Sequence, residues 1–166
     1  DWTKSKTKPS LNKAKILYVG RLKVEKGIFS LLEIFDKMTA DVELSILGKE
    51  ENIKINNKKI NLIGFQNNVR EIIKIYDNHN ITILPSFTEA HPKVVDESLA
   101  RMRPIIIFEE IDHIIQNRSG IFISKRNAKS LLDVINFILS NYPNIQEEMK
   151  KNELPTKEKF ISQMVK

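Results

Sequence analysis

Short apolar runs alternate with amphipathic stretches along most of the chain, starting near residue 15. Six runs are rich in isoleucine, leucine and other apolar residues, and several of them end at a glycine or a proline. Runs of this length and composition are typical of buried β-strands. We therefore expect strands over residues 15–19, 42–47, 60–63, 81–84, 104–108 and 120–123.

The stretches between these runs carry apolar residues at helical spacing. Ile28, Leu31 and Phe35, for example, recur every three or four positions, which places them on one face of an α-helix. The same pattern predicts helices over residues 27–38, 69–76, 92–101, 112–117 and 128–139. From residue 143 onward we expect two further helical stretches, separated at Pro155.

Strands that alternate with helices indicate an α/β fold. We predict a Rossmann-like, doubly wound, six-stranded and mostly parallel sheet with helices on both faces. We divide the chain into a linker or interdomain strap at residues 1–14, a nucleotide-binding domain at 15–142, and a C-terminal helical tail at 143–166. Because the chain opens with Asp rather than Met, we expect it to be a fragment of a longer protein.

Ligands of such sheets bind beyond the carboxyl ends of the strands, at the point where the strand order switches. Candidate chemistry therefore belongs in the loops that follow the strands. These loops are residues 20–26, 48–58, 64–68, 85–92 and 108–112.

Composition narrows the classes of function without choosing one. The 166 residues include no cysteine, which excludes disulfides, thiolate zinc sites and a cysteine nucleophile. The chain shows no apolar run long enough for a membrane span and no signal-peptide core. The net charge of +6 fits a solvated basic surface or a nucleic-acid face. The lysines are scattered, so we expect no nucleic-acid partner.

The loop after the first expected strand carries two basic residues between two glycines. It runs from Gly20 through Arg21 and Lys26 to Gly27. At the start of a helix, backbone N–H groups together with an arginine and a lysine can hold a phosphate. The loop matches neither the dinucleotide-binding nor the Walker A pattern. It fits both a phosphate site and an ordinary basic surface loop.

The loop after the fourth expected strand leads from Glu89 to Glu97. Pro92 suits the first turn of a helix, and Lys93 in that turn opposes the helix dipole unless an anion binds nearby. If both glutamates face one cleft, each can accept hydrogen bonds from a polyhydroxy ligand. Otherwise they are solvated charges at a helix end.

Taken together, the two loops resemble a known family. The G-R-L…E-K-G loop after the first strand, the L-G after the second, and the P-S-x-x-E-x₇-E segment after the fourth are similar to the C-terminal, donor-binding domain of retaining glycosyltransferases of family 4. These are the glycosyl transferases group 1, whose GT-B architecture has two facing Rossmann-like domains. The resemblance covers roughly residues 15–140.

The resemblance implies a role for each matching residue. Arg21 and Lys26 would bind the pyrophosphate of a nucleoside diphosphate sugar, and Glu89 would be the catalytic residue that contacts the transferred sugar. Glu97 would bind the ribose. The other positions implied are His91, Pro92 and Lys93 against the sugar and phosphates, and Gly64 and Phe65 beside the base. The resemblance also implies no cofactor and no obligate metal, and the three histidines are far apart in the sequence.

Three single residues and one loop depart from the family pattern. Ala90 and Met102 stand where the family has glycine, Ser98 stands where alanine is usual, and the acidic segment 108–112 replaces a glycine-rich loop. The acidic residues of that segment could repel a diphosphate. These departures bear on the geometry of the sugar and phosphates but leave the two glutamates and the two basic residues in place.

We therefore expect the donor-binding half of a glycosyltransferase of the hexosyltransferase type, acting in bacterial polysaccharide or glycoconjugate synthesis such as capsule or lipopolysaccharide. Its partners would be a nucleotide-sugar donor and, through an N-terminal domain absent from this chain, a glycan or lipid-linked acceptor. We expect a cytoplasmic location and leave open contact with the inner face of the cell membrane. The alternatives are a non-catalytic nucleotide-sugar-binding module and a sugar-nucleotide epimerase, although we do not find the histidine and glutamate set of the latter.

Overall fold

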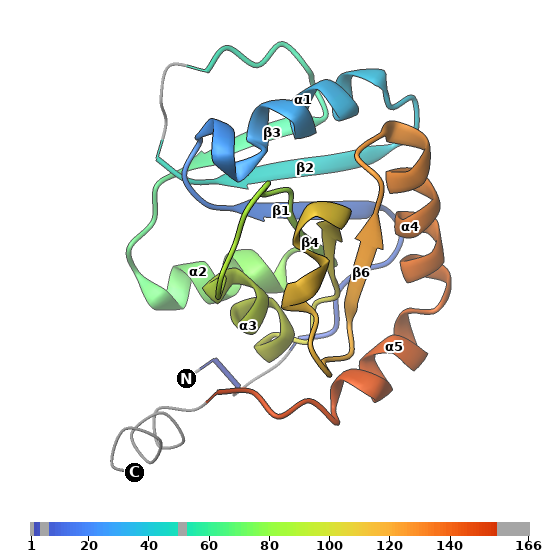
Figure 1. The fold of residues 1–166 in the computed structure, drawn as a ribbon. Helices are drawn as coiled ribbons and strands as arrows, with labels where there is room; N and C mark the ends of the chain where they lie inside the picture. The colour runs from blue at the N-terminus through green and yellow to red at the C-terminus, as the bar shows by residue number, and fades with distance from the viewer. Residues whose placement is uncertain (1, 4–6, 50–52, 156–166) are drawn as a thin grey trace.

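Six parallel strands form a single twisted sheet. The computed structural model describes residues 2–3, 7–49 and 53–155, and orders the strands β3-β2-β1-β4-β5-β6 (Figure 1). Each strand pairs in parallel with its neighbours. The strands are β1 (Ala14–Val19), β2 (Val42–Leu47), β3 (Ile60–Gly64), β4 (Ile81–Leu84), β5 (Ile105–Phe108) and β6 (Ile121–Ser124).

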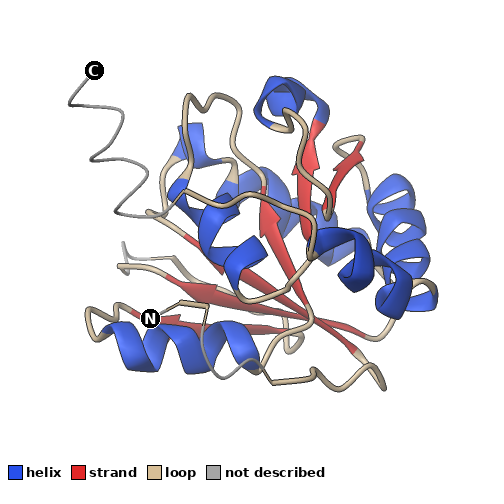
Figure 2. Cartoon of the chain, turned by 90° about the horizontal axis from the view of Figure 1, so that it is seen from below, coloured by secondary structure: helices blue, strands red, loops and turns tan. Residues whose placement is uncertain are grey.

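Helices flank this sheet on both sides (Figure 2). On β1, Ile16 and Tyr18 belong to the large core that also includes Leu31 of the first helix. Leu17, which points to the other side, packs with Tyr76. The helices are α1 (Ile28–Lys37), α2 (Val69–Asp77), α3 (Lys93–Ala100), α4 (Ala128–Ser140) and α5 (Tyr142–Met149), with short 3₁₀ turns η1 (Val24–Lys26) and η2 (Glu109–Ile114). The predicted doubly wound α/β fold is confirmed.

Local sequence accounts for where these elements begin and end. The runs of β4 and β5 are buried throughout, as expected of central parallel strands covered on both faces. Asn68 and Asn127 begin α2 and α4, because each side-chain oxygen accepts a hydrogen bond, 2.9 Å long, from a backbone N–H two or three residues further on. Such caps satisfy donors that a helix leaves unpaired.

Two helical predictions differ from the structure. The helix expected at residues 112–117 is a 3₁₀ turn that begins earlier, at Glu109. Ile111 and Ile114 are both buried, and their spacing of three residues matches the repeat of a 3₁₀ helix. In the tail, α5 ends at Met149 and no helix follows between residues 150 and 155. The second expected stretch, after Pro155, lies outside the described residues.

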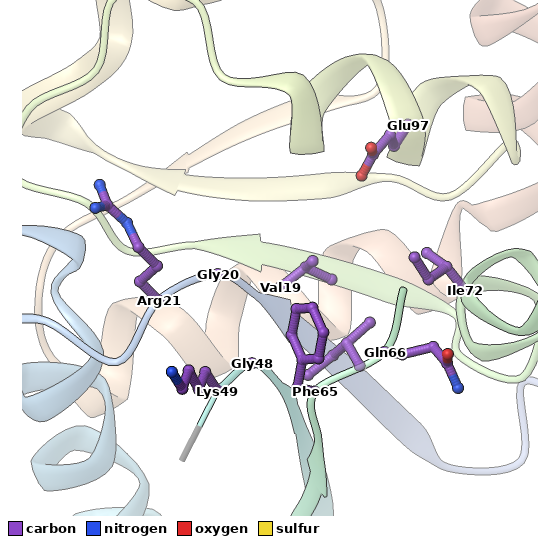
Figure 3. A pocket seen from close by; sticks show the side chains of 10 residues that line it. Val19, Gly20, Arg21, Gly48, Lys49, Phe65, Gln66, Ile72 and Glu97 are labelled. Carbon is purple, nitrogen blue, oxygen red and sulfur yellow. The ribbon is translucent and has the colours of Figure 1, made fainter. Parts of the chain in front are cut away.

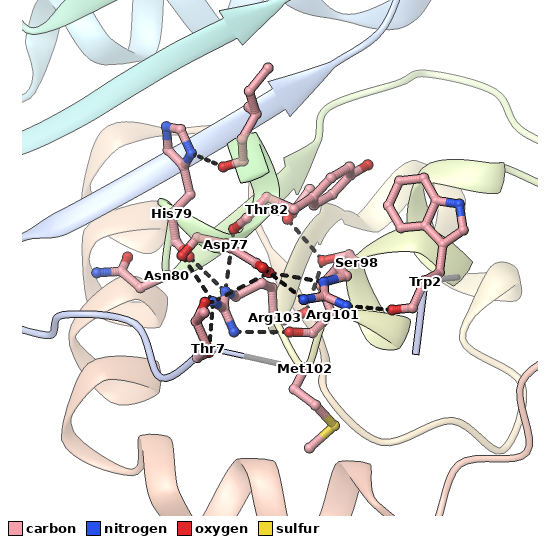
Figure 4. A network of polar contacts seen from close by, with 12 residues as sticks. Trp2, Thr7, Asp77, His79, Asn80, Thr82, Ser98, Arg101, Met102 and Arg103 are labelled. Atoms are coloured by element: carbon pink, nitrogen blue, oxygen red, sulfur yellow. Dashed lines mark hydrogen bonds and ion pairs between the residues drawn. The ribbon is translucent and has the colours of Figure 1, made fainter. Parts of the chain in front are cut away.

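Two buried arginines connect the N-terminal segment to the body of the domain (Figure 4). Arg101 donates to the carbonyl oxygen of Trp2 at 2.7 Å and forms an ion pair with Asp77 at 2.7 Å. Arg103 donates to the carbonyl oxygen of Thr7 at 3.0 Å. Both guanidinium groups are inaccessible to solvent, and burial lowers the pKa of Arg103. The described part of the expected strap is therefore packed against Tyr76 of α2, through Trp2, and against the segment between α3 and β5.

Candidate functional site at the carboxyl ends of the strands

The strand order switches between β1 and β4, and the loops that follow these two strands meet there. β1 lies beside β4 in the sheet although β2 and β3 come between them in sequence. The backbone N–H of Phe87, after β4, donates to the carbonyl oxygen of Glu25, after β1, at 3.1 Å. The two loops that carry the candidate phosphate and sugar residues therefore form one continuous surface at the position where doubly wound sheets bind ligands.

Gly27 allows the two loops to approach closely. Its φ angle is +68°, in the left-handed region that favours glycine. A Cβ atom at this position would lie 1.8 Å from the carbonyl oxygen of Pro85. Only glycine fits here, and the start of α1 is consequently pressed against the loop that bears Glu89.

Lys26 and Glu89 form an ion pair across this junction. The Nζ atom of Lys26 lies 2.6 Å from Oε1 of Glu89, and the buried hydroxyl of Ser86 donates to the same oxygen at 2.7 Å. Nε2 of His113 lies 2.8 Å from the Glu89 carbonyl oxygen. Two side-chain donors therefore fix the carboxylate of Glu89, while His113 contacts its backbone.

A pocket of about 380 Å³ opens at the carboxyl ends of the strands and is lined by the residues labelled in Figure 3. It brings together Arg21, Phe65 and Glu97 from three different loops or helices. Val19, Leu47 and Ile72 provide apolar walls, and Lys49 adds a second positive charge. An exposed aromatic ring, two cations and a carboxylate around one cavity can bind a ligand with a flat ring, an anionic group and hydroxyl groups.

Tyr76 orients Glu97. Its hydroxyl, at the end of a fully buried side chain, donates to Oε2 of Glu97 at 2.9 Å. Burial raises the pKa of Glu97, and this effect exceeds the opposing influence of the hydrogen bond from Tyr76 and of the charge on Lys93. Burial and the nearby Glu97 charge also raise the pKa of Tyr76, which remains a donor. Tyr76 was not identified from the sequence, where it looks like the last apolar residue of an amphipathic helix.

The remaining predicted residues lie at the edge of the site. His91 is largely exposed, with its Nε2 atom 3.4 Å from Asp96. Pro92 is the N-cap of α3 and Lys93 its first residue. Gly64 ends β3 with a φ of +84°, just before Phe65 enters the pocket. None of these four residues, nor Lys26 or Glu89, lines the pocket itself. Their roles stay predictions.

Within the ranges that the structure describes, no group of three or more His, Cys, Asp or Glu side chains is placed to hold a metal ion. In the same part of the chain, no helix is long and apolar enough to cross a membrane.

Comparison with known proteins assigns the chain to a family. The family model described as "Glycosyl transferases group 1" matches residues 2–154. The chain belongs to this family. CapM of Staphylococcus aureus, a capsular polysaccharide biosynthesis glycosyltransferase, is 26% identical over 162 residues, covering 89% of this chain and 42% of CapM. This group 1 glycosyltransferase chain thus spans less than half the length of that relative.

Several solved structures share the fold of this chain. HepE of Anabaena, in a complex with UDP and glucose, matches with a TM-score of 0.67 at 13% identity, over 85% of this chain and 42% of HepE. The C-terminal domain of LpcC, a group 1 glycosyl transferase of Francisella tularensis, matches with a TM-score of 0.62 at 18% identity, over 84% of this chain and 81% of that domain.

Arg126 changes the interpretation of the acidic segment in this member of the group 1 family. Its guanidinium group pairs with Glu110 at 2.8 Å, donates to the carbonyl oxygen of Pro85 at 2.9 Å, and lies 4.0 Å and 4.3 Å from the ring centroids of Phe87 and Phe108. The hydrogen bond from Arg126 lowers the pKa of Glu110. One of the acids expected to repel a diphosphate is thus paired with a cation that also supports the Glu89 loop.

Arg126 was missed because it follows β6, at the edge of the sheet, far in sequence from the matching motifs. Met102 has a φ of +57°, in the left-handed region that favours glycine. It lies just before the amino end of β5, whereas the pocket lies at the carboxyl ends of the strands. This departure from the family pattern is therefore outside the candidate site.

Proposed function

We propose that this chain is the donor-binding half of a retaining glycosyltransferase. The whole enzyme would transfer a hexosyl group from a nucleoside diphosphate sugar to an acceptor hydroxyl in bacterial polysaccharide or glycoconjugate synthesis. The observation that carries the proposal is the pocket at the strand-order switch, where Arg21, Phe65 and Glu97 converge beside the Lys26–Glu89 pair. The UDP and glucose bound by HepE, which has the same fold, support a ligand of this class.

The chemistry of each group fits one part of such a donor. Phe65 is 71% exposed and offers a face on which a base can stack. The Glu97 carboxylate, oriented by Tyr76, can accept hydrogen bonds from two ribose hydroxyls. Arg21 and Lys26 can bind the diphosphate, and Glu89 can accept hydrogen bonds from the sugar.

In the reaction, the bond between the anomeric carbon and the diphosphate oxygen breaks, and the acceptor oxygen forms a bond to that carbon on the same face of the sugar. The proton of the acceptor hydroxyl passes to the departing diphosphate oxygen. The bonding electrons leave with the diphosphate, whose negative charge increases. Cations placed in advance around this group lower the barrier. Arg21 and Lys26 supply such charge, so we expect no obligate metal. Transfer by the intact enzyme should accordingly survive chelation by EDTA.

A thermal-shift panel tests the donor site. The panel contains UDP, GDP, ADP and CMP with their sugar conjugates, each added to the wild-type chain. A ligand at ten times its Kd adds about 1.4 kcal/mol to stability, which raises the Tm by about 3–6 °C for a domain of this size. We expect one base to give this shift and the Arg21→Ala, Phe65→Ala and Glu97→Ala variants to lose it.

Lys129→Ala provides the matched control. Lys129 is exposed on α4, so this substitution removes one positive charge outside the pocket. If no ligand shifts the wild type, or if all variants shift equally, the proposed donor site is wrong. The donor-half assignment predicts that this chain alone transfers no sugar. Robust transfer by the chain alone would contradict it.

A further inference from the structure

Lys26 and Glu89, which are assigned to opposite sides of the donor's scissile bond, form an ion pair with each other. Lys26 Nζ lies 2.6 Å from Glu89 Oε1, and their side chains are only 24% and 10% exposed. Ser86, which is inaccessible to solvent, donates to the same carboxylate oxygen at 2.7 Å. In this geometry, the positive charge assigned to the diphosphate is paired with the carboxylate assigned to the sugar.

A bound diphosphate disturbs this arrangement. A phosphate oxygen within hydrogen-bond distance of Lys26 places a second anion beside the Glu89 carboxylate. The two anions then compete for one ammonium group, and like charges a few ångströms apart repel strongly where solvent is largely excluded. Neighbouring groups offer little compensation, because Ser86 has a single hydroxyl proton and His113 contacts the backbone of Glu89 rather than its carboxylate.

A sugar attached to the diphosphate supplies what the bare diphosphate lacks. Its hydroxyl groups can donate to the Glu89 carboxylate and replace the ammonium group as hydrogen-bond partners. The exchange leaves both charges with partners, Lys26 on phosphate and Glu89 on the sugar. A buried or half-buried charged group that keeps its hydrogen bonds avoids the penalty of an unpaired one.

We propose that the Lys26–Glu89 pair acts as a latch that makes the site select an intact nucleotide sugar over the bare nucleoside diphosphate. This inference rests on the proposed function. Before transfer, the sugar holds the latch open. After transfer, Glu89 loses its sugar partners, competes again for Lys26, and weakens the binding of the diphosphate product. The pair thus makes Glu89 a specificity-determining residue as well as a sugar contact.

Calorimetric titration of the chain with UDP, GDP, ADP and CDP, and with the glucose conjugate of each, tests the latch. Glu89→Gln keeps the shape of the side chain and removes its charge. We expect this variant to bind the bare diphosphate about three- to tenfold more tightly than the wild type does, because Lys26 no longer has to leave a carboxylate. The glucose conjugate should gain less or bind more weakly.

Glu25→Gln is the control for charge alone. Glu25 is exposed on the same loop, and its side chain is not part of the pair, so this variant should change both affinities by less than about twofold. In a Lys26→Met background, Glu89→Gln should no longer tighten diphosphate binding. Far-ultraviolet circular dichroism of each variant verifies that it is folded.

Each result has one meaning. Tighter diphosphate binding by Glu89→Gln that depends on Lys26 supports the latch, including the case in which the wild type binds only a glucose conjugate and the variant also binds the bare diphosphate. Unchanged or weaker binding, with dependence on Arg21 and Glu97 intact, overturns the latch but leaves the donor site standing. If the wild type binds none of the eight compounds, the proposed function itself fails.

Discussion

Replacing Gly27 by alanine should destabilise the domain far more than the addition of one methyl group suggests. The added Cβ would lie 1.8 Å from the carbonyl oxygen of Pro85. Cβ atoms are essentially never found within 3.0 Å of a non-bonded heavy atom. The two loops must therefore separate by at least about 1.2 Å, the difference between 3.0 and 1.8 Å. The same carbonyl oxygen accepts a hydrogen bond from Arg126 at 2.9 Å, so that contact is strained or broken as well.

Three contributions set the expected loss of stability. A left-handed backbone costs an alanine about 1–2 kcal/mol, and a hydrogen bond from a charged donor contributes about 1.5–3 kcal/mol. Alanine also lowers the conformational entropy of the unfolded chain, which stabilises the folded state by about 0.4–1 kcal/mol. We expect Gly27→Ala to lower the free energy of unfolding by about 2–4 kcal/mol, measured by urea denaturation followed with circular dichroism.

Gly64→Ala separates the steric clash from the backbone term. Gly64 also has a positive φ, of +84°, but a Cβ there would meet nothing within 4 Å. This variant should lose only about 1 kcal/mol, from backbone conformation alone. If Gly27→Ala proves no more destabilising than Gly64→Ala, the close packing of the loops after β1 and β4 is wrong.

Three further variants have defined outcomes, each read by urea denaturation. Asp77→Asn should lower the free energy of unfolding by about 3–5 kcal/mol because it leaves a buried guanidinium group without its counter-charge. Glu71→Gln, in an exposed ion pair, should lower it by less than about 0.5 kcal/mol. Equal losses would contradict the buried network. Glu97→Gln should stabilise the domain at neutral pH, because it removes a buried charge. The gain in stability should shrink as the pH falls toward the raised pKa of Glu97, because protonation removes the same charge from the wild type. A gain that is independent of pH would refute this. Arg126→Met should cost about 1–3 kcal/mol, and Glu110→Gln should add little in that background; fully additive losses would show that the two side chains do not interact.

Much of the fold follows from the sequence because one pattern of apolar and polar residues recurs along the chain. Each isoleucine-rich run forms a strand, and each amphipathic stretch between runs forms a helix. The strand β2 lies over residues 42–47 as predicted. The short segment after Phe108 was placed too late, because its two buried isoleucines have a spacing of three that fits a 3₁₀ turn better than an α-helix.

The candidate site is predictable to a lesser degree, and for a different reason. Arg21 follows β1 and Phe65 follows β3, two parallel strands with their carboxyl ends at the same end of the sheet, so their convergence in one pocket is consistent with the topology. The partner of Glu97 does not, since nothing in the sequence links it to a tyrosine 21 positions earlier. The contacts of Arg126 likewise depend on how a loop at the sheet edge folds back over the centre, which only tertiary packing determines.

The position of Arg126 has a consequence for how this sequence can drift over evolutionary time. Its guanidinium group contacts the loop after β4, the acid at position 110 and two aromatic rings. A lineage that loses the arginine leaves the carboxylate of Glu110 uncompensated near the loop that bears Glu89, where it would oppose an anionic ligand. A lineage that loses only the acid leaves a surplus cation there. We therefore expect positions 110 and 126 to change together among relatives, as one inherited unit.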